Sequence, residues 1–319
     1  MKLPELRIGN LVAKVPIIQG GMAIRLSTAR LAAAVANEGG IGLIAASGLP
    51  FDELRYEIQL ARKLSPTGII GINAMVAATQ FAGLVKTAIE EGIDLVVAGA
   101  GFSRDMFAMG KESGTPIVPI VSSAKLARIS EGLGAAAVIV EGCEAGGHLG
   151  TDRSAREIVP EVVAAVKNIP VIAAGGIADG RGMAAAFALG AKAVQMGTRF
   201  VLSEECIAHE NYKNAVLKAK DRATVMTGLT TGHPVRIIDN ALAHKYKSLE
   251  FSGGSKEDLE NLGAGTLRKA AIEGDVKEGS VMIGQISGML TDIKPCATII
   301  KDIMAETETV IKNLQGLVK

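Results

Sequence analysis

The chain has 319 residues, of which 48% are hydrophobic and 21% charged, enough apolar material for a large buried core. Its 34 basic and 33 acidic residues nearly balance, which argues against a surface for nucleic acid or for acidic membranes. Aromatic residues make up only 3% and Trp is absent, so platforms for stacking on single-stranded nucleic acid would be hard to build. We therefore expect small molecules as partners, with no nucleic acid and no membrane.

The cysteines and the N-terminal stretch bear on the compartment. Cys143, Cys206 and Cys296 lie far apart, without CxxC or metal-ligand spacing, which is typical of a reducing compartment. The first residues, MKLPELRIGNLVAK, lack the apolar centre of a signal peptide, and no run of about 18 apolar residues occurs. We expect a cytoplasmic protein without a metal site.

Short apolar runs alternate with helical segments along the first two thirds of the chain. The expected strands are residues 15–19, 40–44, 69–73, 95–97, 116–120, 136–140, 170–173 and 191–196. Their apolar character is continuous, as in parallel strands that are buried on both faces. Between them, stretches such as 52–64 place apolar residues three and four positions apart, the spacing of an amphipathic helix. Ser27, Asp52 and Asp179 are the expected N-terminal caps.

Eight such strand and helix units in about 200 residues predict an α/β fold, the (β/α)8 or TIM barrel, with right-handed crossovers and one parallel sheet. An open, doubly wound sheet is the alternative, but it needs two edges and usually has fewer strands. Residues 1–205 and 291–319 are assigned to the barrel. Residues 206–290 form a second, smaller and mainly helical domain, with helices expected at 257–262 and 265–273, and 295–317 forms a last helix on the barrel wall.

The strand at 136–140 ends in a carboxylate, several glycines and a histidine. Side chains that follow the carboxyl ends of barrel strands form the active site in this architecture. Glu141 stands where the strand stops, Gly146 and Gly147 let a ligand approach the backbone, and His148 titrates near neutral pH. A surface loop with a solvated histidine is the competing interpretation.

Glycines also follow the last two expected strands. Gly175 and Gly176 precede a helix that Asp179 opens, and Gly197 and Thr198 offer backbone N–H groups and one hydroxyl. The loops after strands seven and eight of a barrel commonly bind phosphate. A phosphorylated ligand is therefore predicted, whereas glycines that only permit tight turns are the alternative.

The absence of other motifs restricts the phosphorylated ligand. The chain has no dinucleotide-binding GxGxxG unit, no P-loop, no strand-end lysine for a Schiff base and no metal-ligand cluster. Two amides, Asn73 and Gln195, follow or end expected strands and suit the alternating donors and acceptors of a flavin ring. The pattern favours flavin mononucleotide (FMN), although either amide could instead be satisfied by backbone groups.

These motifs, taken together and in order, resemble a known family. They are QGGMA at 19–23, GIN at 71–73, EGCEAGGHLG at 141–150, VIAAGGIADGRG at 171–182, AVQMGTRF at 193–200, and later HENYK, TGHPVR and EGSVMIGQISG. The resemblance is to the family that contains nitronate monooxygenases (2-nitropropane dioxygenases) and FMN-dependent type II enoyl-acyl-carrier-protein reductases, and it covers nearly the whole chain. One departure is that Ile24 and Arg25 follow GGMA, where the acyl-carrier reductases often have an aromatic residue.

The resemblance implies FMN at the barrel mouth, with its ring beside His148. Its phosphate would lie on Gly175, Gly176, Gly197 and Thr198, and its ring along Gly21, Met22, Asn73, Glu141, Gly147 and Gln195. Ser280, Met282 and Gln285 match a segment that returns to cover the flavin, so residues 206–290 would act as a lid. NADH or NADPH would be the co-substrate, and some relatives use a monovalent cation. A homodimer is the expected assembly.

Three functions follow from this interpretation. The first is the reduction of 2-enoyl thioesters for fatty acid synthesis, and the second is oxidation of alkyl nitronates with O2 by a nitronate monooxygenase. The third is a non-catalytic barrel that binds FMN or a sugar phosphate. The acyl group of the first could be carried by coenzyme A or by acyl carrier protein, whose acidic surface would meet Arg25, Arg153 or Arg199 at the mouth.

Overall fold

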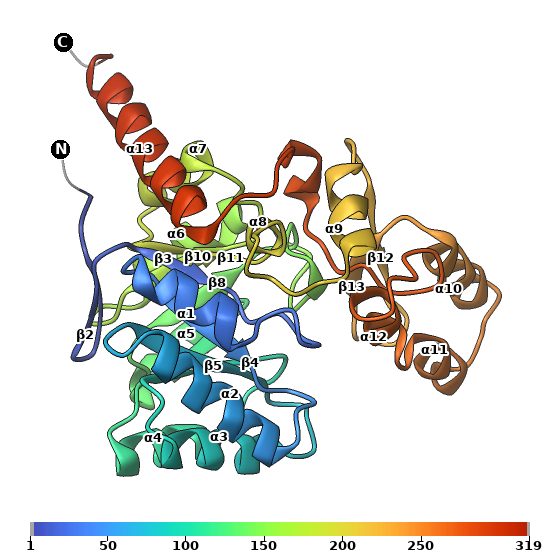
Figure 1. Ribbon diagram of the computed structural model, residues 1–319, viewed down its shortest axis with the longest axis horizontal. Helices are drawn as coiled ribbons and strands as arrows, with labels where there is room; N and C mark the ends of the chain where they lie inside the picture. Colours follow the sequence, from blue (N-terminus) through green and yellow to red (C-terminus); the bar gives the residue numbers. More distant parts are fainter. Residues whose placement is uncertain (1–2, 318–319) are drawn as a thin grey trace.

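The computed structural model describes residues 3–317 and contains a closed barrel (Figure 1). Its parallel strands follow the order β10-β11-β3-β4-β5-β6-β7-β8. They are β3 (Ile17–Gln19), β4 (Ile41–Ala45), β5 (Ile69–Met75), β6 (Leu95–Gly99), β7 (Ile117–Val121), β8 (Val138–Glu141), β10 (Val171–Ala174) and β11 (Ala193–Met196). Each coincides with an expected strand, so the TIM-barrel prediction is confirmed and the open sheet is excluded.

Helices cover the outside of this barrel. They are α1 (Ala29–Asn37), α2 (Phe51–Leu64), α3 (Phe81–Glu90), α4 (Asp105–Ser113), α5 (Ala124–Gly132), α6 (Ala155–Ala165), α7 (Gly180–Ala188) and the short α8 (Thr198–Val201). In β6, Leu95 and Val97 pack into the cluster inside the barrel, whereas Val96 and Ala98 pack beneath the helices. Both faces of the strand are therefore buried, which explains the continuous apolar runs.

Of the three predicted caps, one is confirmed. The Asp179 carboxylate accepts a hydrogen bond from the Gly182 backbone N–H at 3.0 Å, at the start of α7. The other two are wrong. Helix α1 has Thr28 at its N-cap, because the Ser27 hydroxyl instead accepts from the Met22 N–H at 2.8 Å, and Asp52 lies inside the first turn of α2.

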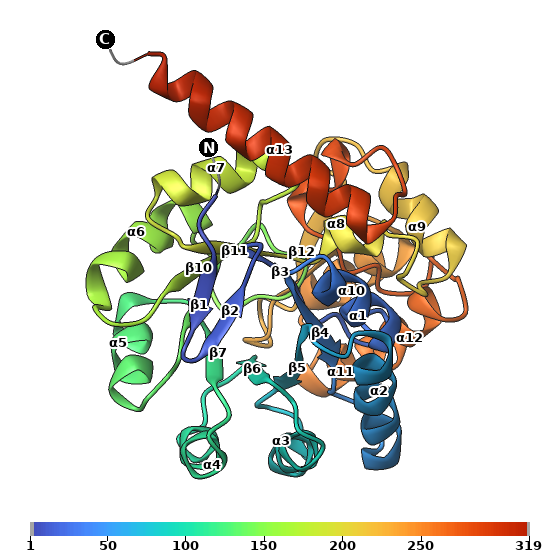
Figure 2. The same cartoon turned by 60° about the vertical axis from the view of Figure 1, so that its left-hand side comes forward.

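A hairpin that the sequence pattern did not reveal crosses one end of the barrel (Figure 2). It consists of β1 (Leu6–Ile8) and β2 (Leu11–Ala13), which pair antiparallel. Leu6, Ile8 and Ala13 share a buried cluster with the residues inside the barrel. The hairpin thus covers the amino ends of the strands, and the carboxyl ends are left for a site.

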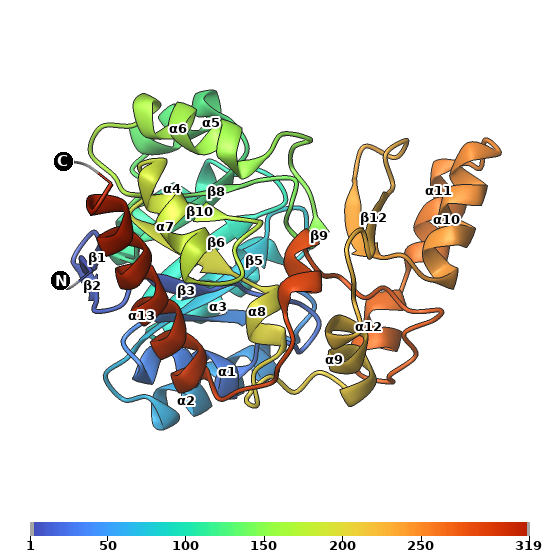
Figure 3. The same ribbon diagram turned by 90° about the horizontal axis from the view of Figure 1, so that it is seen from above.

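Residues 206–290, hereafter the insert, lie to one side of the barrel (Figures 1 and 3). The insert contains α9 (Glu210–Leu217), β12 (Thr224–Thr227), β13 (Val235–Ile238), α10 (Ala241–Phe251), α11 (Lys256–Gly263), α12 (Thr266–Ala271) and a 3-10 helix, η1 (Gln285–Met289). It is mainly helical, as predicted. In addition, β12 and β13 form a hairpin, and β13 pairs with β9 (Gly147–His148) of the barrel loop. Strands this short leave little periodicity in the sequence.

The last helix, α13 (Cys296–Gln315), returns to the barrel. It packs on α7, where the Glu306 carboxylate accepts a hydrogen bond from the Gly180 N–H at 2.7 Å. Its buried face includes Ile299 and Ile303, whereas Leu314 is exposed, and the end of the helix extends beyond the barrel (Figure 1). Within residues 3–317, no helix combines the length and the apolarity needed to cross a membrane.

Candidate active site

His148 is held in a strand and does not lie in a free surface loop. Its backbone pairs with Val235 of β13, and the next residue, Leu149, donates its N–H to the Pro234 carbonyl oxygen at 2.9 Å. The side chain is exposed. The insert therefore fixes the backbone of His148, so the imidazole extends from a defined position in the segment that follows β8.

The surroundings of His148 favour its neutral form. Although the side chain is accessible to solvent, burial among protein atoms lowers its pKa below the ordinary histidine value, and the charge of His233 lowers it further. At neutral pH the imidazole is therefore uncharged. One ring nitrogen then donates a hydrogen bond and the other accepts one.

Glu141, the last residue of β8, has the opposite shift for the same reason. The side chain is half-buried, and no hydrogen bond to it is found among residues 3–317. Burial raises its pKa to about 7. Near neutral pH this carboxyl group can therefore either donate a proton in a hydrogen bond or accept one.

This shift predicts a pH-dependent stability for the FMN-free protein. The pKa of Glu141 is about 7 in the folded state and about 4.3 in an unfolded chain. The stability that the protonated carboxyl contributes is complete below pH ~4 and is lost as the pH rises through 7. Over that interval, we expect the free energy of unfolding of the wild type to fall relative to that of Glu141→Gln, measured by urea unfolding. The exposed Glu38→Gln is the control, and equal slopes for all three proteins would contradict the assignment.

Two amide side chains stand at the carboxyl ends of barrel strands, as predicted. Gln195 of β11 is 7% exposed, and its buried Oε1 atom has no hydrogen-bond partner within the described residues. Asn73 of β5 is half-buried, and its side-chain amide also forms no hydrogen bond within residues 3–317. Leaving a buried acceptor unpaired costs about 1–3 kcal/mol. Such groups fit the N–H and carbonyl groups along the edge of a flavin ring.

The loop after β3 reaches both of these amides. A Cβ atom at Gly21 would overlap the side chain of Asn73, so only glycine allows this approach. The Met22 sulfur would lie 3.5 Å from a Cβ at Gly197. The loop is held by the Ser27 hydroxyl, which accepts from the Met22 N–H at 2.8 Å and from Gln19 Nε2 at 2.7 Å. A Cβ at Gly20 would lie 3.4 Å from the Gln195 side chain, so this loop borders both amides.

Four backbone N–H groups are free in the two loops where an anion site is predicted. Those of Gly175, Gly176, Gly197 and Thr198 have no hydrogen-bond partner within the part of the chain that the structure describes. The Thr198 hydroxyl accepts from the Gly284 N–H at 2.9 Å, which leaves its own proton free to be donated. Unpaired N–H groups of this kind bind phosphate, so the residues fit FMN.

Two N–H groups at the amino end of α7 are used within the protein. That of Gly180 is paired with Glu306 and that of Gly182 with Asp179. These two N–H groups are therefore not available to a phosphate. The anion site consists of the loop residues before α7 and of the first residues around α8.

Gly146 lies against the returning chain, a contact that the sequence did not predict. A Cβ at this position would overlap the backbone of Ile283 and lie 2.6 Å from the nitrogen of Gly284. Gly147 has φ +85°, and the Met282 sulfur would lie 3.7 Å from its Cβ. Gly146 therefore permits close approach of the returning chain, and Gly147 provides the left-handed conformation that precedes His148.

We expect Gly146→Ala to destabilise the protein by roughly 1–3 kcal/mol, because the added methyl must displace the backbone of Ile283. Urea unfolding measures the change. The control is Gly263→Ala at the end of α11, where the new Cβ would make an ordinary contact with Tyr246 at 3.6 Å. We expect that control to be neutral or slightly stabilising. Equal stabilities for the two variants would exclude the close contact.

The three residues expected in the covering segment are placed differently. Met282 lies against Gly147, and the exposed Gln285 is anchored by its N–H, which donates to the Glu144 carbonyl oxygen at 2.9 Å. Ser280 is buried, and its hydroxyl is 2.8 Å from that of Thr266 in α12. Ser280 thus belongs to the packing of the insert, and its predicted contact with the flavin is not supported by this position.

Two residues of the TGHPVR motif lie close to the site without having been assigned to it. Arg236 is 5% exposed, and its Nη2 and Nε donate to the Cys143 carbonyl oxygen at 2.7 and 3.0 Å. It therefore fixes the loop between Glu141 and His148 from the side of the insert. His233 precedes the strand that pairs with His148. The only signal for either residue was the family motif.

The three arginines expected to meet a carrier protein all have acidic partners. The ion pairs are Arg25 with Glu53, Arg153 with Glu161 and Arg199 with Asp292. Arg199 is also 8% exposed. These side chains therefore serve local structure and are not free cations at the barrel mouth.

The geometry defines the class of this protein. A closed parallel barrel with an anion site after its last two strands, an unpaired buried amide and a histidine at the same end is an FMN-type oxidoreductase barrel. Residues 5–306 match the family model described as nitronate monooxygenase. The chain belongs to the nitronate monooxygenase family, and it is an FMN-dependent oxidoreductase.

Individual relatives carry several names. The structure of FabK from Thermotoga maritima is 44% identical, covers 96% of this chain and 97% of its own, and superposes with a TM-score of 0.92. A (3aS,4S,5R,7aS)-5-hydroxy-7a-methyl-1-oxo-octahydro-1H-indene-4-carboxyl-CoA dehydrogenase of Mycobacterium tuberculosis is 31% identical over 95% of this chain and 96% of its own. A probable nitronate monooxygenase of Staphylococcus saprophyticus is 34% identical over 77% and 81%.

Proposed function

We propose that the protein reduces 2-enoyl thioesters with NADH or NADPH. The observation that carries this proposal is the similarity to FabK, a type II enoyl-acyl-carrier-protein reductase. This similarity is higher in identity and coverage than that to the nitronate monooxygenase relative. The Mycobacterium tuberculosis relative is named as a carboxyl-CoA dehydrogenase, and this name also indicates a coenzyme A thioester as substrate. When bound, FMN would take a hydride from the nicotinamide and supply it to the β-carbon of the thioester.

His148 acts on the thioester oxygen in this proposal. Hydride addition at the β-carbon places negative charge on that oxygen, and an N–H donor held there stabilises the charge. The reaction is completed when the α-carbon takes a proton, from solvent or from the imidazole, which solvent then reprotonates. The lowered pKa keeps the imidazole neutral. A neutral imidazole is better suited to donate a hydrogen bond than to act as a general acid. The fixed backbone of β9 pre-organises this donor, and Met282 and Gln285 would exclude water from the mouth.

The second candidate is nitronate oxidation. The family model and the Staphylococcus saprophyticus relative carry that name, and a neutral imidazole can also accept a proton or hold the nitronate anion. A non-catalytic FMN or sugar-phosphate barrel is the third, and it would leave His148 without a role. A monovalent cation, a carrier-protein substrate and a homodimer stay predictions.

An anaerobic titration of the FMN-loaded protein separates these functions. FMN absorbance is followed while NADH or NADPH is added and then a short 2-enoyl thioester. Bleaching by the nicotinamide and recovery with the thioester would support the reductase. Bleaching by an alkyl nitronate alone, with recovery in air, would support the monooxygenase and contradict the reductase. No bleaching by either compound would favour the non-catalytic barrel.

A further inference from the structure

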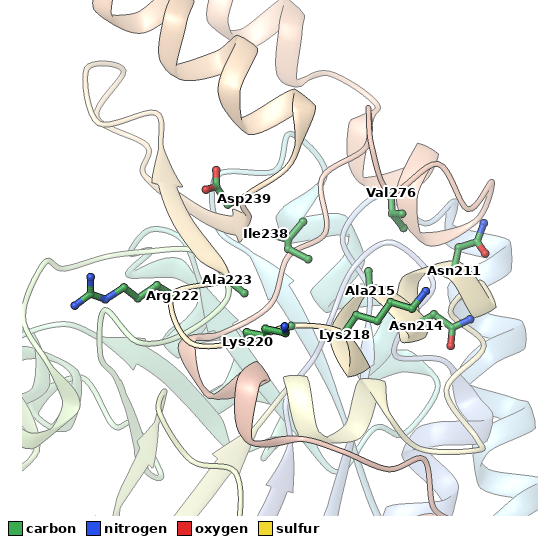
Figure 4. A pocket seen from close by; sticks show the side chains of 11 residues that line it. Asn211, Asn214, Ala215, Lys218, Lys220, Arg222, Ala223, Ile238, Asp239 and Val276 are labelled. Carbon is green, nitrogen blue, oxygen red and sulfur yellow. The ribbon is translucent and has the colours of Figure 1, made fainter.

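A hollow of about 570 Å³ lies in the insert, outside the site described above. It is open to solvent and borders α9, the end of β13 and the start of β12 (Figure 4). Its volume is in the range of small-molecule sites, about 300–1,000 Å³. The barrel residues that would hold FMN are not among those that line it.

The charges around this hollow are unbalanced. Lys218, Lys220 and Arg222 line it, and within residues 3–317 none of the three forms an ion pair. One carboxylate, that of Asp239, lies at the far end and contacts His244 at 3.0 Å. The carboxyl end of α9 attracts basic residues, but that effect is confined to the last turn and does not account for Arg222. The Arg222 guanidinium points away from the other lining side chains in Figure 4, so Lys218 and Lys220 supply the charge of the hollow. A concave surface with two unpaired lysines favours a polyanion.

The opposite side of the hollow is apolar. Figure 4 shows Lys218 and Lys220 on one side, with Ile238 and Val276 on the side that faces them. Both apolar residues are half-buried. A wall of this kind can cover a flat base while the lysines meet phosphate groups. The combination suits a nucleotide better than the convex acidic surface of a carrier protein.

The hollow is connected to the active site through β13. Val235, its first residue, pairs with His148, and Ile238, its last, lines the hollow. Three residues of a strand span about 10 Å. In addition, a Cβ at Gly288 of η1 would lie 3.0 Å from Lys220, so the covering segment borders the same loop. An extended ligand with its reactive end at His148 could therefore place its other end here.

We propose that this hollow binds the phosphorylated adenosine diphosphate end of such a ligand, an inference that rests on the proposed function. Both a coenzyme A thioester and NADPH carry this group. The lysines would meet the phosphates, and the apolar wall would cover the adenine. The site would thus hold the end of a substrate or co-substrate that takes no part in the chemistry.

Equilibrium binding to the FMN-loaded protein tests the proposal without turnover. Calorimetric titrations with coenzyme A and with NADP+, which carries the same phosphorylated end as NADPH but cannot reduce the flavin, compare the wild type, Lys218→Ala/Lys220→Ala and the charge reversal Lys220→Glu. The control is Lys247→Ala/Lys256→Ala, which removes the same charge from α10 and α11. We expect the double variant to lose at least about tenfold in affinity, the charge reversal to lose more, and the control to be unchanged. Added salt should weaken wild-type binding.

Each outcome has a defined meaning. Loss of affinity for coenzyme A alone assigns the hollow to the thioester, and loss for NADP+ alone assigns it to the co-substrate. The proposal is overturned if neither ligand binds the wild type, if the double variant binds both ligands as tightly as the wild type, or if the control loses as much as the double variant. Failure of the anaerobic reductase titration would leave these binding results intact, so the two proposals fail separately.

Discussion

Replacing His148 with Ala should lower the turnover number with a 2-enoyl thioester by about 10²–10⁴-fold while the protein keeps its FMN. The ring is exposed at the barrel mouth, so its removal opens no core cavity. Of the two half-reactions, only hydride addition to the thioester loses the N–H donor that stabilises the charge on the thioester oxygen. Steady-state kinetics and the flavin content of the purified variant measure the two effects, and the rate of bleaching by the nicotinamide should stay close to that of the wild type.

Two further variants sharpen this prediction. His148→Gln keeps an N–H donor that cannot exchange protons near neutral pH, so partial recovery indicates a hydrogen-bond role and no recovery indicates proton transfer. His244→Ala removes an exposed histidine from α10 and should leave turnover unchanged. Wild-type turnover in flavin-loaded His148→Ala would remove this residue from the mechanism.

Gly176→Asp should weaken FMN binding by about 10²-fold or more. A Cβ at Gly176 would lie 3.4 Å from that of Glu144, so the substitution adds a second carboxylate next to Glu144. It would also bring negative charge close to the unpaired N–H groups of Gly175, Gly176, Gly197 and Thr198 and repel the phosphate by roughly 1–4 kcal/mol per unit of charge at about 4 Å. Binding is measured from the change in flavin fluorescence when FMN is added to the FMN-free protein.

The matched control is Gly114→Asp at the end of α4. Gly114 and Gly176 both have φ +73°, so the two substitutions share the same backbone cost of roughly 1–2 kcal/mol. A Cβ at Gly114 would meet no atom within 4 Å. We expect Gly176→Asp to unfold at the lower urea concentration, because its new carboxylate is repelled by Glu144, and we expect only Gly176→Asp to lose FMN affinity. Equal FMN affinity would place the phosphate elsewhere.

The barrel was predictable because each strand is buried on both faces. A run such as that of β6 must be apolar throughout, since Leu95 and Val97 fill the barrel and Val96 and Ala98 meet the helices. The local sequence therefore reports the strand directly. The glycine pair Gly175 and Gly176 was equally informative, because their φ values of +88° and +73° exclude most other residues.

Contacts between distant parts of the chain could not be predicted in the same way. Strand β9 has only two residues, and its partner β13 lies far along the chain. No periodicity reveals such a pairing. The role of Gly146 depended likewise on where Ile283 returns, and the commitment of Ser280 to Thr266 depended on the packing of α12. A sequence motif identifies the residues, whereas the residues that they contact depend on the tertiary fold.

The pairing of β9 with β13 also constrains how this protein could be recombined with its relatives. The insert supplies Val235 as the strand partner of His148 and Arg236 as the clamp on Cys143. A chimera with residues 206–290 of a relative would have a different strand partner for β9. The position of the His148 backbone, and with it that of the imidazole, would change accordingly. Substrate preference and the placement of the reactive imidazole should therefore be inherited as one unit, and a functional crossover would have to exchange the loop after β8 together with the insert.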